Sequence, residues 1–86
     1  MENKEIKVNP NEIKIKDGMF IYGNYVISPQ KNAFNELKSY WLTKKLYAVS
    51  VYAVSSEADK SITVEEAAKL FEQNIPYLEE VYRKAA

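Results

Sequence analysis

Short apolar runs, separated by turn residues, occupy the first third of the chain. Ile13 and Ile15 alternate with charged residues, which is the period-two pattern of a strand with one apolar face. The dipeptides Asp17-Gly18 and Gly23-Asn24 follow, and both are typical of tight hairpin turns because glycine adopts a positive φ without strain. The pattern therefore predicts a three-stranded antiparallel meander. Its strands are expected at residues 12–16, 19–22 and 25–28.

Residues 30–43 admit two interpretations. Phe34, Leu37 and Trp41 are spaced at i, i+3 and i+7, which places them on one face of a helix. The alternative is a loop followed by a strand at 39–43, which turns at Lys44-Lys45 into the next strand. Period-two alternation is poor from residue 36 to residue 43, so we predict a middle helix over 30–43.

Residues 46–55 give the clearest strand pattern in the chain. They are rich in valine and tyrosine and are apolar on both faces, which favours a central strand covered above and below. Residues 6–8 are a further candidate edge strand, ended by Pro10, which cannot donate to a ladder. A polar connection is expected at 55–61.

The last third of the chain carries a well-marked helix start. Thr63 followed by Glu66 matches a capping box, in which each side chain bonds the other residue's backbone N–H. Apolar residues then recur at steps of three and four from Val64 to Ala85. Pro76 interrupts this stripe and removes a helical N–H, so a kink or a break is expected there. The expected fold is one α+β domain over residues 1–86, a small antiparallel sheet packed against helix.

Composition restricts the chemistry that this chain can perform. Its 86 residues include no cysteine and no histidine, which removes thiolate chemistry, the usual metal ligands and the commonest general base. Adjacent carboxylates such as Glu79 and Glu80 diverge by about 100° on a helix and do not converge on one atom. We therefore expect no enzymatic activity, no cofactor and no metal site.

Apolar runs are short throughout the chain. The longest, residues 46–54, has nine residues, and a membrane helix needs about 20. The first twelve residues are polar and lack a hydrophobic signal region. These patterns predict a soluble intracellular protein of the cytoplasm.

Charge is balanced overall but uneven along the chain. The formal net charge is zero, yet residues 29–56 carry four lysines against one acid, and residues 57–86 carry seven acids against four basic residues. Lysines beside aromatic residues are typical of single-stranded nucleic-acid sites, whereas an acidic helix suits a basic surface on another protein. The single arginine, Arg83, lies in the acidic third and weakens the nucleic-acid interpretation.

Candidate partner-binding residues come from these two regions. Tyr40, Trp41 and Tyr77 are the aromatic residues that we expect to be exposed, because they lie beside polar or chain-bending positions. Each of the chain's tyrosines has packing in the core as its simpler explanation. The candidate set is Lys38, Tyr40, Trp41, Lys44, Lys45, Glu72, Tyr77, Glu79 and Glu80.

Part of the sequence resembles a known class of small proteins. The runs Asn32-Ala33-Phe34 and 39–45 (SYWLTKK), together with frequent Lys, Asn, Ile and Tyr, resemble accessory proteins carried by phages of low-GC Gram-positive bacteria. The likeness covers about a third of the chain and includes no motif with a known mechanism. It implies a protein that blocks a host or defence protein, as anti-CRISPR inhibitors do. If a phage encodes the chain, the cytoplasm in which it is expected is that of the host cell. No functional residue is carried over from it.

Three functional hypotheses follow. The leading one is a non-catalytic protein-binding module that inhibits or regulates its partner. The second is an accessory protein that binds single-stranded nucleic acid through Lys38, Tyr40, Trp41, Lys44 and Lys45. The third is a self-associating subunit, in which a sheet edge or the apolar stripe of the last helix pairs with a second copy.

Overall fold

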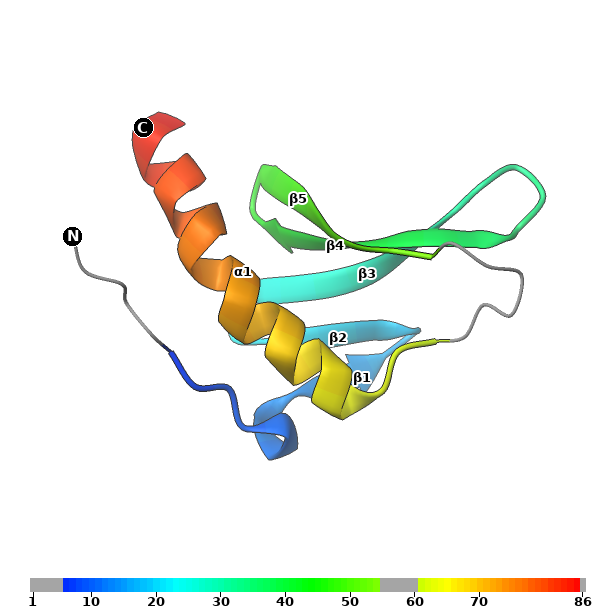
Figure 1. Cartoon of the computed structure of the whole chain (residues 1–86), viewed down its shortest axis with the longest axis horizontal. Coiled ribbons are helices and arrows are strands. Elements are labelled where there is room, and N and C mark those ends of the chain that lie inside the picture. The colour runs from blue at the N-terminus through cyan, green and yellow to red at the C-terminus, as the bar shows by residue number, and fades with distance from the viewer. Residues whose placement is uncertain (1–5, 55–60, 86) are drawn as a thin grey trace.

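The computed structural model describes residues 6–54 and 61–85 of the chain. Within these residues five strands, one short 3-10 helix and one α-helix follow one another (Figure 1). Their bounds are η1 Pro10–Glu12, β1 Lys14–Lys16, β2 Met19–Tyr22, β3 Tyr25–Lys31, β4 Leu37–Lys44, β5 Tyr47–Ala53 and α1 Val64–Ala85.

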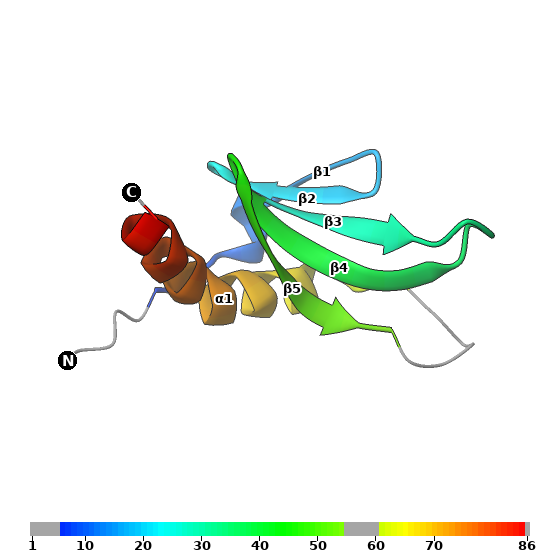
Figure 2. The same cartoon turned by 90° about the horizontal axis from the view of Figure 1, so that it is seen from above.

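The five strands form one antiparallel sheet in the order β1-β2-β3-β4-β5, so each strand pairs with its neighbour in sequence. The predicted three-stranded meander is confirmed. Asp17 and Gly18 join β1 to β2 with φ values of 54° and 79°, the positive pair that a type I′ turn requires. The helix α1 lies against one face of the curved sheet (Figure 2), so the α+β class is also confirmed.

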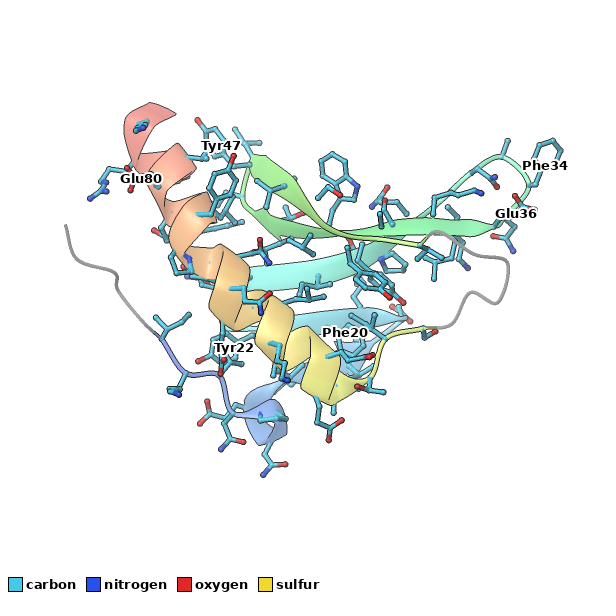
Figure 3. All side chains as sticks on the ribbon, in the orientation of Figure 1. Phe20, Tyr22, Phe34, Glu36, Tyr47 and Glu80 are labelled. Atoms are coloured by element: carbon cyan, nitrogen blue, oxygen red, sulfur yellow. The ribbon has the colours of Figure 1, made fainter. Side chains whose placement is uncertain are left out.

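The core lies between α1 and the sheet. The largest side chains with no exposed surface are Phe71 and Leu78 on the helix, Ile27 on β3 and Leu42 on β4. Figure 3 shows Phe20 and Tyr22 on the side of β2 that α1 covers, and the Tyr22 ring lies 5.5 Å from that of Phe71. Burying each such side chain stabilises the fold by about 1.5–3 kcal/mol.

The predicted middle helix at 30–43 is wrong, and the alternative, a loop followed by a strand, is correct. The Asn32 side-chain oxygen accepts the backbone N–H groups of Phe34 and Glu36, each at 2.9 Å. These local bonds offer the backbone an alternative to helix, and Asn35 turns the loop with a φ of 66°. Phe34 is 82% exposed at the loop tip (Figure 3), so the apparent helical stripe does not form a single face.

The predicted kink or break at Pro76 has no support, because α1 is one continuous helix from Val64 to Ala85. Phe71 and Ile75 before the proline, and Leu78 after it, are all buried against the sheet. The stripe stays in register across Pro76, and this shared burial offsets the cost of about 3 kcal/mol for proline in a helix interior. The capping box is confirmed: Thr63 N–H donates to Glu66 Oε1 at 2.7 Å, and Glu66 N–H donates to Thr63 Oγ1 at 3.1 Å.

The strand predicted at 46–55 exists, but it is an edge strand rather than a central one. Among the described residues β5 pairs only with β4, and Leu46 lies in the preceding turn, 93% exposed. Trp41 pairs with Ser50 while Tyr40 pairs with Tyr52, so Val51 is an extra residue in a bulge. A strand that is apolar on both faces is therefore not necessarily a central strand with other elements packed above and below it. Ser55 lies outside the described residues.

The segment 6–8 is not a strand, which corrects the candidate edge strand there. Val8 is buried, and its backbone N–H donates to the Glu72 carboxylate at 2.8 Å. The segment therefore contacts the helix instead of extending the sheet. This places a short extended arm beside α1 (Figure 1).

Candidate functional site

The sheet has one face packed against α1 and a second face that no described element covers (Figure 2). Side chains alternate between the two faces along each strand, and directly paired residues share a face. Ile21 pairs with Val26 and alternates with buried Phe20, so it lies on the uncovered side. We call this side the open face; its residues are Lys14, Lys16, Met19, Ile21, Val26, Ser28, Trp41, Thr43, Ala48 and Ser50.

Trp41 is the aromatic residue of the open face and lies one strand in from the β5 edge. On β4 it pairs with Ser28 on one side and with Ser50 on the other, and it is 37% exposed. Its indole N–H donates to Ser39 Oγ at 3.0 Å, so the polar edge of the ring has a partner within the protein. Small neighbours on both sides leave the ring as the largest apolar feature of this region.

The open face has a cationic border and no anionic residue. Lys14 pairs with Ile21 and Lys16 with Met19, which places both lysines at the β1 edge of the open face. The five strands in the described part of the chain contain five lysines and neither aspartate nor glutamate. A surface of this kind attracts a partner that is acidic around an apolar centre.

The structure separates Tyr40 from Trp41, which the sequence analysis had grouped in one exposed patch. Tyr40 is 2% exposed in the core, and its hydroxyl accepts the backbone N–H of Ile62 at 3.3 Å. Its predicted exposure is therefore wrong, because neighbours in a strand point to opposite faces. The predicted exposure of Trp41 and Tyr77 is correct, since Tyr77 is 58% exposed on α1.

Lys44 and Glu79 form a partly buried cluster with Tyr25. Lys44 Nζ lies 2.7 Å from Glu79 Oε2, and the Tyr25 hydroxyl donates to the same oxygen at 2.5 Å. The Lys44 ammonium also lies over the rings of Tyr25 and Tyr82, at 5.4 and 4.9 Å from their centroids. β3 and β4 are thus tied to the last turns of α1, and the two charges offset each other.

Two pKa values report this cluster. The hydrogen bond from Lys44, and then that from Tyr25, lower the pKa of the Glu79 carboxyl, because both stabilise its charged form. Burial first, and then the contact with the Glu79 carboxylate, raise the pKa of Tyr25 to about 12. The cluster therefore holds a carboxylate and a neutral phenol at neutral pH. These bonds join β3, β4 and α1 at one point, and we call this arrangement the clasp.

The other predicted site residues are scattered over separate parts of the surface. Glu72 accepts the N–H of Val8. Glu80 lies 2.8 Å from Arg83 and 3.9 Å from Lys84 along the exposed side of α1. Lys45, in the β4–β5 turn, lies 6.0 Å from the centroid of the Tyr82 ring. Lys38 lies on β4, 3.8 Å from Glu36. The structure does not bring these residues together in one site.

Sequence reasoning missed the apolar residues that share the open face with Trp41. Met19, Ile21 and Val26 are partly exposed on the open face. The sequence held a signal for this apolar surface. Met19–Tyr22 is apolar on both of its faces, and a single helix can cover only one face of a sheet. Lys14 and Lys16 gave a second signal, since both alternate with Ile15 on β1.

The described residues contain no group of three metal-ligating side chains. In the same part of the chain, no helix has the length and apolarity needed to cross a membrane. Comparison with family models, with curated proteins and with solved structures finds no match for this chain. The open face, which carries Trp41 and the apolar residues of β2 and β3, is the candidate site.

Proposed function

We propose that this protein is a non-catalytic binding module whose open face docks on another protein. The observation that carries the proposal is a partly exposed tryptophan on a sheet face that no described element covers. Tryptophan in such a position is the residue type most enriched among interface hot spots. Met19, Ile21 and Val26 extend the apolar surface of the same face across β2 and β3, and near-neutral contacts around a hot spot help to exclude water.

The charge of the open face supports a partner with an acidic rim. Lys14 and Lys16 lie on one border, and no acidic residue opposes them on the strands. Long-range attraction of this kind increases the association rate more than it lowers the dissociation rate. The resemblance to phage accessory proteins adds the expectation that the partner is a host or defence protein that is inhibited or regulated by docking.

The test uses Trp41, the only tryptophan in the chain. Proteins captured from a host lysate are identified and purified, and each is titrated against the module while Trp41 fluorescence and its quenching by acrylamide are recorded. Docking on the open face should shield the indole from the quencher. We expect Trp41→Ala to weaken affinity by about 2 kcal/mol or more, roughly 30-fold.

Tyr77→Ala is the matched control, because it removes an exposed aromatic residue from α1 and not from the sheet. It should leave affinity unchanged. Two results would exclude the open face as the docking surface. One is an equal loss of affinity for Trp41→Ala and Tyr77→Ala. The other is a complex in which acrylamide quenches Trp41 fluorescence as strongly as in the free protein. Lys14→Glu with Lys16→Glu should slow association and reduce its dependence on salt.

Single-stranded nucleic acid is the second candidate, since Lys14, Lys16 and Trp41 share one face. Stacking on an exposed aromatic ring between cationic side chains is how many such sites work. The same fluorescence titration with oligonucleotides distinguishes the two. If the oligonucleotide quenches Trp41 fluorescence at low salt and this quenching disappears as the salt concentration rises, nucleic-acid binding is supported. If the oligonucleotide causes no quenching at low salt, this candidate is removed.

A further inference from the structure

β5 leaves its outer side unpaired within the described residues. It pairs with β4 alone, and Ala48, Ser50 and Tyr52 along it are exposed. Its seven residues contain no charge, no proline and no glycine. An edge of this composition presents free backbone N–H and C=O groups to any second strand, and natural sheets normally protect such edges with charge or proline.

The opposite edge of the same sheet is protected. β1 has only three residues, and Lys14 and Lys16 flank Ile15 on it. Two copies that met through β1 would bring four lysines together, which like-charge repulsion opposes. The apolar stripe of α1 is also not available, because Phe71, Ile75 and Leu78 are buried against the sheet. The sequence suggested two kinds of surface for self-association, a sheet edge and the apolar stripe of the last helix. Of these, the β5 edge is the one that remains.

The last turn of α1 extends to this edge. The Tyr82 ring contacts that of Tyr47, the first residue of β5, with centroids 5.2 Å apart. Three more helical residues, 83–85, follow Tyr82, and the C-terminal end of the helix lies past β5 (Figure 1). The helix thus reaches beyond the sheet that it covers, and a strand added beside β5 would lie next to these turns.

We propose that β5 pairs antiparallel with β5 of a second copy, so that the two sheets become one across a two-fold axis. A second copy fits this edge because both strands are uncharged and both are rich in β-forming side chains. A two-fold axis makes the contact isologous and closed, which gives a dimer and not a filament. Trp41 lies one strand in from the edge, so the proposed docking surface remains free and the two proposals are independent.

The bulge at Val51 limits the strength of this pairing. Val51 has no partner on β4, and a bulge increases the local twist of the strand. Regular pairing is therefore restricted to the first part of β5, Tyr47 to Ser50. An interface this short falls at the small end of specific contacts, so the dimer should be reversible and dependent on concentration.

Sedimentation velocity of the full chain is the first measurement, made from about 10 µM to about 1 mM, a range suited to weak association. We expect a monomer at the lower limit and a reversible dimer at the upper one. A single 9.9 kDa species throughout this range overturns the proposal.

Two matched pairs of lysine substitutions then locate the contact. Ala48→Lys on β5 is compared with Thr43→Lys, its register partner on β4, and Ser50→Lys with Ser28→Lys, which lie on either side of Trp41. All four positions share the open face, but only Ala48 and Ser50 are on the edge strand. We expect the edge variants to weaken dimerisation at least about tenfold, because lysine blocks edge pairing, and the inner variants to leave it unchanged.

Circular dichroism melts show which variants remain folded. If Ala48→Lys unfolds, the Ser50 and Ser28 pair alone decides the question. Equal weakening by edge and inner variants would mean that copies associate through the open face. No weakening by either edge variant would place the contact elsewhere. Both outcomes overturn the proposal.

Discussion

At the scale of single residues, neighbours in β4 have opposite environments. Tyr40 is buried beneath the helix, and Trp41 is exposed on the other side of the same strand. Their chemistry is similar, so composition does not distinguish them. Their positions along the strand do, because successive side chains of a strand point to opposite faces of the sheet. This distinction requires the knowledge that residues 37–44 form a strand.

Tyr25 provides a prediction at this scale. Its pKa is raised to about 12, whereas an unfolded tyrosine titrates near 10. The folded state therefore holds this proton more tightly, and the stability contribution is complete below about pH 10 and is lost as pH rises toward about 12. Tyr25→Phe removes the group, so we expect the melting temperature to decline less steeply over that range. Thermal melts at several alkaline pH values measure this decline.

The control is Tyr77→Phe, which removes an exposed hydroxyl of the same type from α1. Its melting curves should follow those of the unmodified protein at each pH. Identical alkaline declines for Tyr25→Phe and the unmodified protein would show that the bond to Glu79 does not contribute.

At the scale of elements, local signals were reliable where the bonds that define an element are themselves local. The capping box at Thr63 and the Asp17-Gly18 turn form between residues close in sequence. The continuity of α1 through Pro76 is different, because it depends on burial against strands that are distant in sequence. The helix predicted at 30–43 is the exception. The bonds of Asn32 that turn this loop are local, but the i, i+3, i+7 spacing of apolar residues arose there without a helix and was the more conspicuous signal.

The capping box gives the prediction for this scale. We expect Thr63→Ala to lower the free energy of unfolding by about 1 kcal/mol, because Glu66 N–H loses its acceptor at the helix start. Urea titration measures the change. Ser61→Ala is the control, since it removes a hydroxyl from an exposed residue just before the cap. A Thr63→Ala loss no larger than that of Ser61→Ala would contradict a stabilising role for the box.

At the scale of the whole molecule, the core depends on one helix packed against one face of the sheet. Phe71 is at the centre of this contact and has no exposed surface. We expect Phe71→Ala to lower the free energy of unfolding by about 3–5 kcal/mol, much of the roughly 5–10 kcal/mol expected for a domain of this size. Chemical denaturation measures the loss, and much of the variant should be unfolded at 37 °C.

Phe34→Ala is the matched control for this prediction. It makes the same substitution at a loop tip that is 82% exposed, so it should change stability by less than about 0.5 kcal/mol. A comparable loss at both positions would mean that the core is not where the structure places it.

The sequence alone determined the α+β class, the meander of the first three strands, both glycine turns and the start of α1. Each depends on periodicity or on bonds between residues near in sequence, and these are physical properties of the local chain. It also determined that histidine and cysteine chemistry is absent.

Only the tertiary structure decided where those elements lie relative to one another. It placed β5 at an edge, brought Lys44 and Glu79 into contact with Tyr25, and put Met19, Ile21 and Val26 on the same sheet face as Trp41. Strand order and the face that a helix covers depend on packing between distant segments. An apolar pattern is the same on a covered strand and on an edge strand, so it does not reveal which one the fold leaves free.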